Sequence, residues 1–225
     1  MPIDLAKSYE CFQPEKRTEK IHIVGVGSGG LTVAEMLVRS GITNLVLWDF
    51  DTVESHNLAN QLYRQQDVGK LKVDAAKEIL TEINDDIADK IKLRPNGWDG
   101  QNMSGIIFLN VDNIDLRRRI VEQHYDSPCV TAMFDCRNGL KVGQTFAAEW
   151  DNAEMKEFFL STMAFSHDEA KDETPVSACN VSLAVVPTIR TICSLEVANF
   201  MNWWNGEPMK RMIVCDPYSF EITSF

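Results

Sequence analysis

Apolar segments of strand length alternate with amphipathic segments of helix length over the first part of the chain. Ile21–Val26 and Leu45–Trp48 are continuously apolar, as parallel strands are when both faces of their sheet are covered. Apolar residues recur at helical spacing over Leu31–Arg39 and again over Gly69–Ile83. These four segments predict two successive strand–helix units.

The strands expected after these units are shorter. We expect them at residues 91–93, 105–109 and 129–133, with a helix between the last two that is capped by Asp112 or Asn113. Strands that alternate with helices through residue 133 predict the α/β class. We therefore expect a Rossmann-like, doubly wound and mostly parallel sheet with helices on both faces.

The pattern changes after residue 133. Added antiparallel strands are expected on the C-terminal side, at residues 143–150, 212–215 and 220–223. Residues 151–178 are acidic, contain several Phe and show no clear periodicity, which predicts a mobile crossover loop. A long apolar helix is expected over Val181–Trp204, with Pro187 as a point of interruption. Residues 1–20 read as a polar leader, and residues 21–225 as one domain.

Charge and cysteine usage narrow the choice of partners. The 225 residues carry 33 acidic and 22 basic side chains, a net charge of −11, which disfavours nucleic acid or an anionic membrane as a partner. The chain opens without a signal-peptide pattern, and its apolar runs are too short for a membrane span, so we expect a cytoplasmic protein. Its six cysteines include no C-x-x-C pair, so we expect no structural zinc.

A glycine-rich turn joins the first expected strand to the first expected helix. Gly25, Gly27 and Gly30 satisfy the pattern G-x-G-x-x-G. Glycines let the backbone approach phosphates closely, and the helix N-terminus offers free N–H groups to them. Asp49 ends the second strand about 20 residues later, where a carboxylate can accept hydrogen bonds from ribose hydroxyls. These features predict a nucleotide-binding site.

Four motifs in order make the prediction more specific. They are GVGSGG (25–30), DFDTVESHNLANQ (49–61), DVGKLK (67–72) and NVDNIDLRRR (110–119). Together they resemble the adenylation domain of the ThiF/MoeB/HesA family, relatives of ubiquitin-activating enzymes, over about residues 20–204. The resemblance implies an adenylyltransferase that uses ATP and Mg²⁺ and forms a homodimer, as its relatives do.

The activity that the resemblance implies is specific. Such enzymes activate the C-terminal glycine carboxylate of a small β-grasp protein, a ubiquitin-like protein or a sulfur carrier, as an acyl-adenylate, turning ATP into AMP and pyrophosphate. That carrier and a second copy of the chain are therefore the expected partners. Attack on the α-phosphate builds up negative charge, so the site needs a cationic side chain and a divalent ion beside the phosphates.

The resemblance also assigns residues to the site. Asp49 would hold the ribose, Lys72 would contact the phosphates, and Asp112 would bind Mg²⁺. For Asp112 the alternative is helix capping, and for Lys72 it is a solvated helix lysine. The residues expected at the nucleotide are Gly25, Gly27, Ser28, Gly29, Gly30, Asp49, Asp51, Asn57, Gln61, Arg64, Lys72 and Asn113.

Two departures from the family pattern leave a second function open. Asn60 stands where the family has a phosphate-binding arginine, and Arg64 is the residue that could substitute for it. The N-terminal region also lacks the arginine segment that reaches into the neighbouring subunit in bacterial members. Loss of a guanidinium that stabilises transition-state charge can slow phosphoryl transfer by orders of magnitude. A nucleotide-binding scaffold subunit without catalysis is therefore the main alternative.

Cys179 completes the expected catalytic set with Lys72 and Asp112. It precedes Pro187 by eight residues, much as the family places its acceptor cysteine. A thiolate there could receive the acyl group as a thioester, or sulfur chemistry could pass through a disulfide or persulfide. A buried, unreactive thiol at a helix start is the alternative.

Two further functions share the glycine turn or the family. An NAD(P)- or FAD-dependent oxidoreductase would use the same turn, but the HNLANQ block and the D-x-G-x-x-K segment argue against it. An adenylating dehydratase that acts on a tRNA base is a relative of this family, and the acidic charge of the chain argues against it.

Overall fold

The computed structural model describes residues 3–173 and 184–225. Its strands are β1 (Ile21–Val24), β2 (Leu45–Trp48), β3 (Lys92–Arg94), β4 (Gly105–Leu109), β5 (Val130–Asn138), β6 (Gly143–Glu149), β7 (Met212–Asp216) and β8 (Glu221–Ser224). They form one sheet in the order β3-β2-β1-β4-β5-β6-β7-β8. The first five strands in that order are parallel, and β6, β7 and β8 are added antiparallel. The expected sheet is confirmed.

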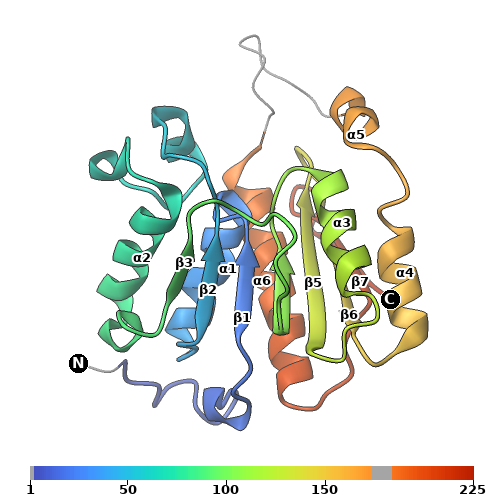
Figure 1. Cartoon of the computed structure of the whole chain (residues 1–225), viewed down its shortest axis with the longest axis horizontal. Helices are drawn as coiled ribbons and strands as arrows, with labels where there is room; N and C mark the ends of the chain where they lie inside the picture. Colours follow the sequence, from blue (N-terminus) through green and yellow to red (C-terminus); the bar gives the residue numbers. More distant parts are fainter. Residues whose placement is uncertain (1–2, 174–183) are drawn as a thin grey trace.

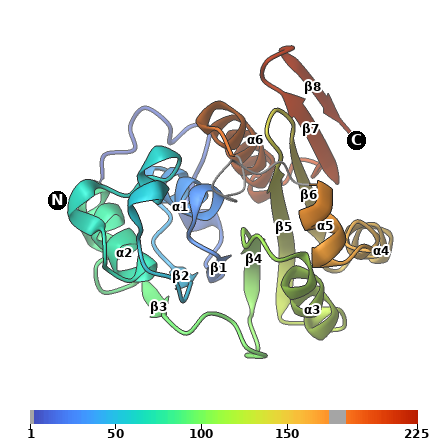
Figure 2. The same cartoon turned by 90° about the horizontal axis from the view of Figure 1, so that it is seen from above.

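Helices cover both faces of the sheet (Figures 1 and 2). They are α1 (Ser28–Arg39), α2 (Lys72–Ile83), α3 (Ile114–His124), α4 (Ala153–Ser161), α5 (His167–Glu173) and α6 (Val186–Trp204). Figure 2 shows α1, α2 and α6 on one face and α3, α4 and α5 on the other. Short 3-10 helices lie at Pro14–Lys16, Ser55–Ala59, Gln65–Asp67 and Asp85–Ile87. No helix within the described ranges has the length and apolar character that a bilayer span requires.

The core is divided by the sheet into two layers. Side chains alternate along a strand, so neighbours in β1 enter different layers. Ile21 and Ile23 pack with the α1, α2 and α6 layer, whereas Val24 packs in the layer that includes residues of α3 and α4. Parallel strands buried on both faces explain why these segments read as continuous apolar runs.

The order of the strands creates a switch point beside β1. From β1 the chain continues to β2 on one side, and from β3 it crosses back to β4 on the other side. Ligands of open parallel sheets bind where the carboxyl ends of such strands diverge. The ends of β1, β2 and β4 are therefore the place where the predicted site residues should meet.

The expected crossover loop over residues 151–178 is wrong for the part that the structure describes. This part contains α4 and α5. Asn152 caps α4 by accepting a hydrogen bond from the Met155 N–H at 3.1 Å, and Phe159 is fully buried against the sheet. The periodicity was hard to detect because Phe159 is the only fully buried residue that α4 contributes.

The expected interruption at Pro187 is also wrong. Pro187 lies in the first turn of α6, where its missing N–H has no helical partner to lose and its fixed φ suits the helix. The proline therefore helps to begin α6 instead of breaking it. Residues 181–183, the start of the expected helix, lie outside the described residues.

Candidate nucleotide-binding site

The glycine turn packs closely against the end of β4. Gly25 has φ +87°, and a Cβ there would lie 2.8 Å from backbone atoms of Asn110 and Val111. A Cβ on Gly30 would lie 1.8 Å from the Gly25 carbonyl oxygen. Gly27 is different, because a Cβ there would have no atom within 4 Å. Two of the glycines are thus required by packing, while Gly27 borders open space at the start of α1.

The N-terminus of α1 faces that turn without a side-chain cap. Gly27 is the N-cap and Ser28 the first helical residue, and no side chain accepts a hydrogen bond from the first N–H groups. Unpaired N–H groups and the helix dipole favour an anion at this position. The local structure therefore has the form of a phosphate site.

Asp49 ties the end of β2 to the glycine turn. Its Oδ2 accepts a hydrogen bond from the Val26 N–H at 2.8 Å, and its Oδ1 accepts one from the Asp51 N–H at 2.9 Å. Burial raises the pKa of this carboxyl above its ordinary value. Each carboxylate oxygen has a second lone pair, so Asp49 still has acceptor capacity for a ribose hydroxyl.

Lys72 lies at the start of α2 and reaches back to the end of β2. Its Nζ is 2.7 Å from Asp51 Oδ2, and its side chain is 10% exposed. The Tyr63 hydroxyl lies 2.7 Å from the Val26 carbonyl oxygen and 3.1 Å from that of Lys72. Tyr63 thus joins the glycine turn to α2. Its neighbours in the sequence did not indicate this role.

The segment between β2 and α2 holds the other expected residues. Asn57 is buried, and its side-chain oxygen accepts a hydrogen bond from the Glu54 N–H at 2.9 Å. The Gln61 Oε1 is buried and has no hydrogen-bond partner among the described residues. Asn60 ends the 3-10 helix Ser55–Ala59 and brings no charge.

Arg64 is engaged elsewhere. Its guanidinium donates to Asp67 at 2.9 Å and to Glu82 at 2.6 Å, so it is neutralised by two carboxylates. Its expected contact with the nucleotide stays a prediction. For that contact the guanidinium would have to leave Asp67 and Glu82. Lys72 differs from Arg64, because its ion-pair partner, Asp51, belongs to the expected site.

The end of β4 differs from the end of β2, because the side chains of Asn110 and Asp112 have no partners among the described residues. Asn110 follows β4 directly, and both of its side-chain polar atoms are buried and unbonded within the described part of the chain. Its Oδ1 would lie 2.8 Å from a Cβ on Gly29, which places the amide beside the start of α1. Asn110 begins the fourth motif but was assigned no role there, although its position directly after β4 at the switch point was a usable signal.

The sequence left helix capping open for Asp112 and Asn113, and it offered metal binding as the other role of Asp112. Asn113 caps α3, since its Oδ1 accepts a hydrogen bond from the Leu116 N–H at 3.0 Å. Asp112 is exposed and bonds to no other described residue. Its carboxylate is therefore free to bind a ligand, and its alternative as the helix cap is excluded.

A buried ion-pair network fixes the loop that carries these residues. Arg117 donates through Nε to the Val111 carbonyl oxygen at 2.7 Å and pairs with the fully buried Asp135 of β5. Arg137 also pairs with Asp135 and donates to the Thr162 carbonyl oxygen at 2.7 Å. Arg117 thus supports the loop that carries Asp112.

The donors at the switch point suit a nucleotide with its metal ion. Asn110 and Gln61 present buried polar atoms without partners, and Gly27 leaves room beside a helix N-terminus. The described residues contain no group of three His, Cys, Asp or Glu side chains that could hold a metal ion. A single carboxylate such as Asp112 suits Mg²⁺, which commonly takes its other ligands from phosphates and water. Cys179 lies outside the described residues.

Fold and site together define a doubly wound domain with a glycine-rich turn at its switch point. A family model described as "ThiF family" matches residues 5–225. The chain therefore belongs to the ThiF family, and the resemblance seen in its motifs is confirmed.

Relatives in this family match over limited stretches. Ubiquitin-like modifier-activating enzyme 5 of Arabidopsis thaliana is 46% identical over 71 residues, which are 32% of this chain and 16% of that protein. Its namesake from Culex quinquefasciatus is 30% identical over 132 residues, 52% of this chain and 32% of the relative. The matched stretches span less than two thirds of either relative.

Solved structures share the fold at low identity. The structure of E. coli MccB with ATP has a TM-score of 0.74 at 17% identity, covering 94% of this chain and 65% of that one. PaaA has a TM-score of 0.70 at 19% identity, covering 92% of this chain and 64% of that one. At these identities the likeness concerns the fold.

Proposed function

We propose that the chain is an adenylating enzyme that uses ATP to activate the C-terminal carboxylate of a ubiquitin-like protein. The observation that carries the proposal is the end of β4, where the side chains of Asn110 and Asp112 have no partners among the described residues and lie beside the glycine-rich turn. Family membership and the name of the relatives support the choice of reaction and of partner.

In this proposal the nucleotide lies across the carboxyl ends of β1, β2 and β4. The glycine turn and the N-terminus of α1 receive the phosphates, and Asp49 accepts from the ribose. Lys72, shared with Asp51, supplies positive charge beside the α-phosphate. Asp112 would hold Mg²⁺, which when bound neutralises charge on the phosphates.

The chemistry is a displacement at the α-phosphate. A carboxylate oxygen of the carrier attacks phosphorus, the bond to the bridging oxygen breaks, and pyrophosphate leaves with the electron pair. The acyl-adenylate then contains the C-terminal glycine of the carrier and AMP. No proton transfer is needed, because the attacking carboxylate is already ionised, so electrostatic stabilisation is the main task of the site.

ATP–pyrophosphate exchange tests the reaction. With a ubiquitin-like protein that ends in Gly-Gly, we expect radiolabel from pyrophosphate to enter ATP, and Lys72→Ala to abolish the signal. The same carrier with an amidated C-terminus is the control, since it offers no carboxylate. A protein that binds ATP but gives no exchange with any such carrier would contradict the proposal.

That negative result would favour the scaffold subunit. The specific observation behind this second function is that Asn60 is neutral and Arg64 is bound by Asp67 and Glu82. Neither supplies a free guanidinium to the phosphates. A scaffold would bind ATP with the same residues but would show no exchange.

We further propose that Cys179 receives the activated group after adenylation. Cys179→Ala should keep exchange and lose a covalent, thiol-sensitive adduct with the carrier, measured by mass spectrometry of the intact protein. Cys129→Ala is the matched control, because Cys129 is an exposed free thiol elsewhere. An adduct that persists in Cys179→Ala would remove this residue from the mechanism.

We also propose a homodimer as the assembly, on the strength of the family resemblance. Sedimentation velocity at micromolar concentration should give a mass of about two chains. A single species at the mass of one chain across that range would contradict this assembly.

A further inference from the structure

One part of the sheet has no helix over it. On the face opposite α1 and α2, only the connection between β3 and β4 passes over β1, β2 and β3 (Figure 2). This connection, residues 95–104, is fully described and contains no helix. Crossovers between parallel strands usually place a helix on the sheet. Its absence here leaves a cavity of about 370 Å³ on the sheet surface.

Three cationic side chains line this cavity. Lys20 precedes β1, and Lys92 and Arg94 lie in β3. No carboxylate is among the lining residues, and none of the three cations has an ion-pair partner within the described ranges. Such a gathering of positive charge is unusual for a chain with a net charge of −11. The repulsion within it would be offset by a bound anion.

His22 of β1 contributes a buried donor at the base of the cavity. It is 6% exposed, and its Nδ1 lies 3.0 Å from the indole Nε1 of Trp48. An indole N–H can only donate, so Nδ1 must be the unprotonated acceptor. In the neutral ring the proton is therefore on Nε2, which has no hydrogen-bond partner among the described residues.

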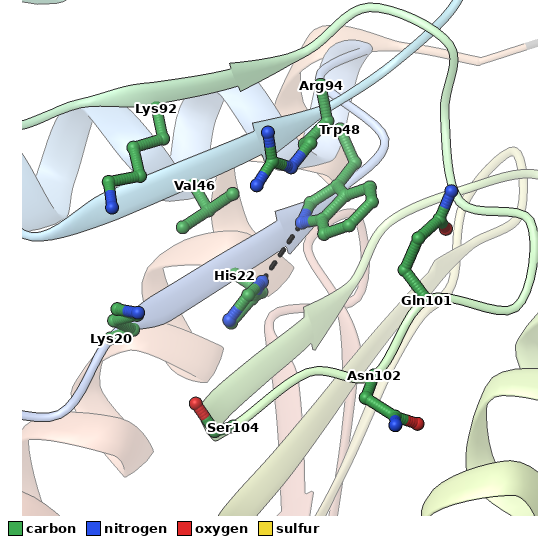
Figure 3. Close-up of a pocket in the computed structure, with 9 residues that line it drawn as sticks. All are labelled: Lys20, His22, Val46, Trp48, Lys92, Arg94, Gln101, Asn102 and Ser104. Atoms are coloured by element: carbon green, nitrogen blue, oxygen red, sulfur yellow. Dashed lines mark hydrogen bonds between the residues drawn. The ribbon is translucent and has the colours of Figure 1, made fainter.

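The neutral state of His22 follows from its surroundings. Burial, and after it the positive charge of Lys20, lowers the pKa of His22 to about 4. The backbone of Ser104 acts in the opposite direction. His22 consequently stays neutral at neutral pH, and its buried Nε2–H is directed toward the backbone of Ser104 at the base of the cavity. Figure 3 shows this nitrogen on the side of the ring toward Lys20 and Ser104.

Arg94 and Trp48 form the other end of the cavity. The Arg94 guanidinium carbon lies 5.6 Å from the centre of the Trp48 ring, in a cation–π contact. A guanidinium held over an indole keeps its N–H groups available at its edges. Trp48 is also bonded to His22, so one aromatic side chain touches both the cation and the buried donor.

We propose that this cavity binds the phosphate group of a small molecule, either free phosphate or a phosphate monoester. Lys20, Lys92 and Arg94 surround the anion, and the neutral ring of His22 forms the base of the cavity beneath it. Two cations on β3 and one on the segment before β1 suit a tetrahedral, multiply charged group better than a carboxylate. None of these residues belongs to the expected nucleotide set, so the proposal goes beyond the proposed adenylation.

Side-chain NMR of His22 tests the proposal directly. Inorganic phosphate is titrated into ¹⁵N-labelled protein while the Nε2–H resonance of His22 is followed. We expect a saturable shift with a millimolar dissociation constant, typical of a small exposed anion site. Lys92→Gln should weaken binding about tenfold, the value of one lost charge-assisted hydrogen bond. Lys171→Gln, which removes a lysine charge from α5, is the matched control and should bind as the natural protein does.

Three further titrations separate the possible outcomes. Methyl phosphate should shift the same resonance if the site accepts monoesters, and acetate should bind more weakly than phosphate. Lys72→Ala should retain the shift, because Lys72 belongs to the nucleotide site. The proposal is overturned if phosphate leaves His22 unchanged, if Lys171→Gln weakens binding as much as Lys92→Gln does, or if Lys72→Ala removes the shift.

Discussion

The ends of β2 and β4 lie on opposite sides of β1, and they differ in whether their polar side chains have bonding partners. At the end of β2, Asp49 and Asp51 are bonded to backbone N–H groups and to Lys72. At the end of β4, Asn110 and Asp112 have no partners within the described residues. A buried amide without partners costs about 1–3 kcal/mol. The proposed function accounts for the difference: the β2 end is built in advance, and the proposed nucleotide would complete the β4 end.

The largest expected effect concerns Asp112. Asp112→Asn should slow ATP–pyrophosphate exchange by about 100-fold or more, because the proposed Mg²⁺ loses its protein carboxylate. Its thermal unfolding without ligand should not change, since the carboxylate makes no bond to any residue that the structure describes. Asp126→Asn is the control, as it removes an exposed carboxylate that follows α3. Equal rates for the two variants would refute the role of Asp112.

Asp49→Asn should have its main effect on stability. The amide can accept from only one of the two N–H groups of Val26 and Asp51, and its NH₂ group then faces the other. We expect the free energy of unfolding in urea to fall by about 2 kcal/mol. Asp51→Asn should cost less than about 1 kcal/mol, because that ion pair is half exposed on the Asp51 side. A stability equal to that of the natural protein in Asp49→Asn would contradict a prebuilt β2 end.

Asn110→Ala should give the reverse pattern. Without ligand, the free energy of unfolding should change by less than about 1 kcal/mol, because the lost packing is offset by removal of unsatisfied polar atoms. ATP affinity, measured by calorimetry, should fall about tenfold through loss of one hydrogen-bonding group at the ligand. A large loss of stability with normal affinity would show that Asn110 has a structural role instead.

The smallest effect is the pH dependence that Asp49 introduces. Burial raises its folded-state pKa above the ordinary value of 3.8. The folded protein therefore retains this proton where the unfolded chain has released it, so the stabilising contribution is full below 3.8 and is lost as pH rises through the folded pKa. Comparing urea unfolding of the natural protein and Asp49→Asn across this range isolates the contribution. The free energy of unfolding of the natural protein should fall relative to that of Asp49→Asn as the pH rises. A difference between the two that stays constant with pH would contradict the raised pKa of Asp49.

Much of the fold could be predicted because buried parallel strands leave a plain trace in the sequence. The runs at 21–26, 45–48 and 105–109 are apolar on both faces, and the structure places β1, β2 and β4 there. The helix α4 was missed because it buries little besides Phe159, so its apolar residues do not mark a broad stripe. Pro187 was misread because a proline in a first helical turn looks the same in sequence as one in a helix interior.

Only the site residues that lie in recognisable motifs could be predicted from the sequence. The glycine turn and Asp49 have local signatures, and the structure brings them together. Tyr63 and Arg117 could not be foreseen, since their roles depend on carbonyl oxygens of residues distant in the chain or in a loop. The cavity beside His22 depends on a missing crossover helix, and the proton position follows only from the contact with Trp48.

The most direct test of the contrast between the two strand ends is urea unfolding of Asp49→Asn and Asn110→Ala, each with and without ATP and Mg²⁺. Ligand that binds only the folded state raises the free energy of unfolding by RT ln(1 + [L]/Kd). We predict that Asp49→Asn lowers the ligand-free value, while Asn110→Ala keeps that value and loses about 1.4 kcal/mol of the rise caused by ATP. A full rise in Asn110→Ala, with its ligand-free stability reduced, would contradict the account.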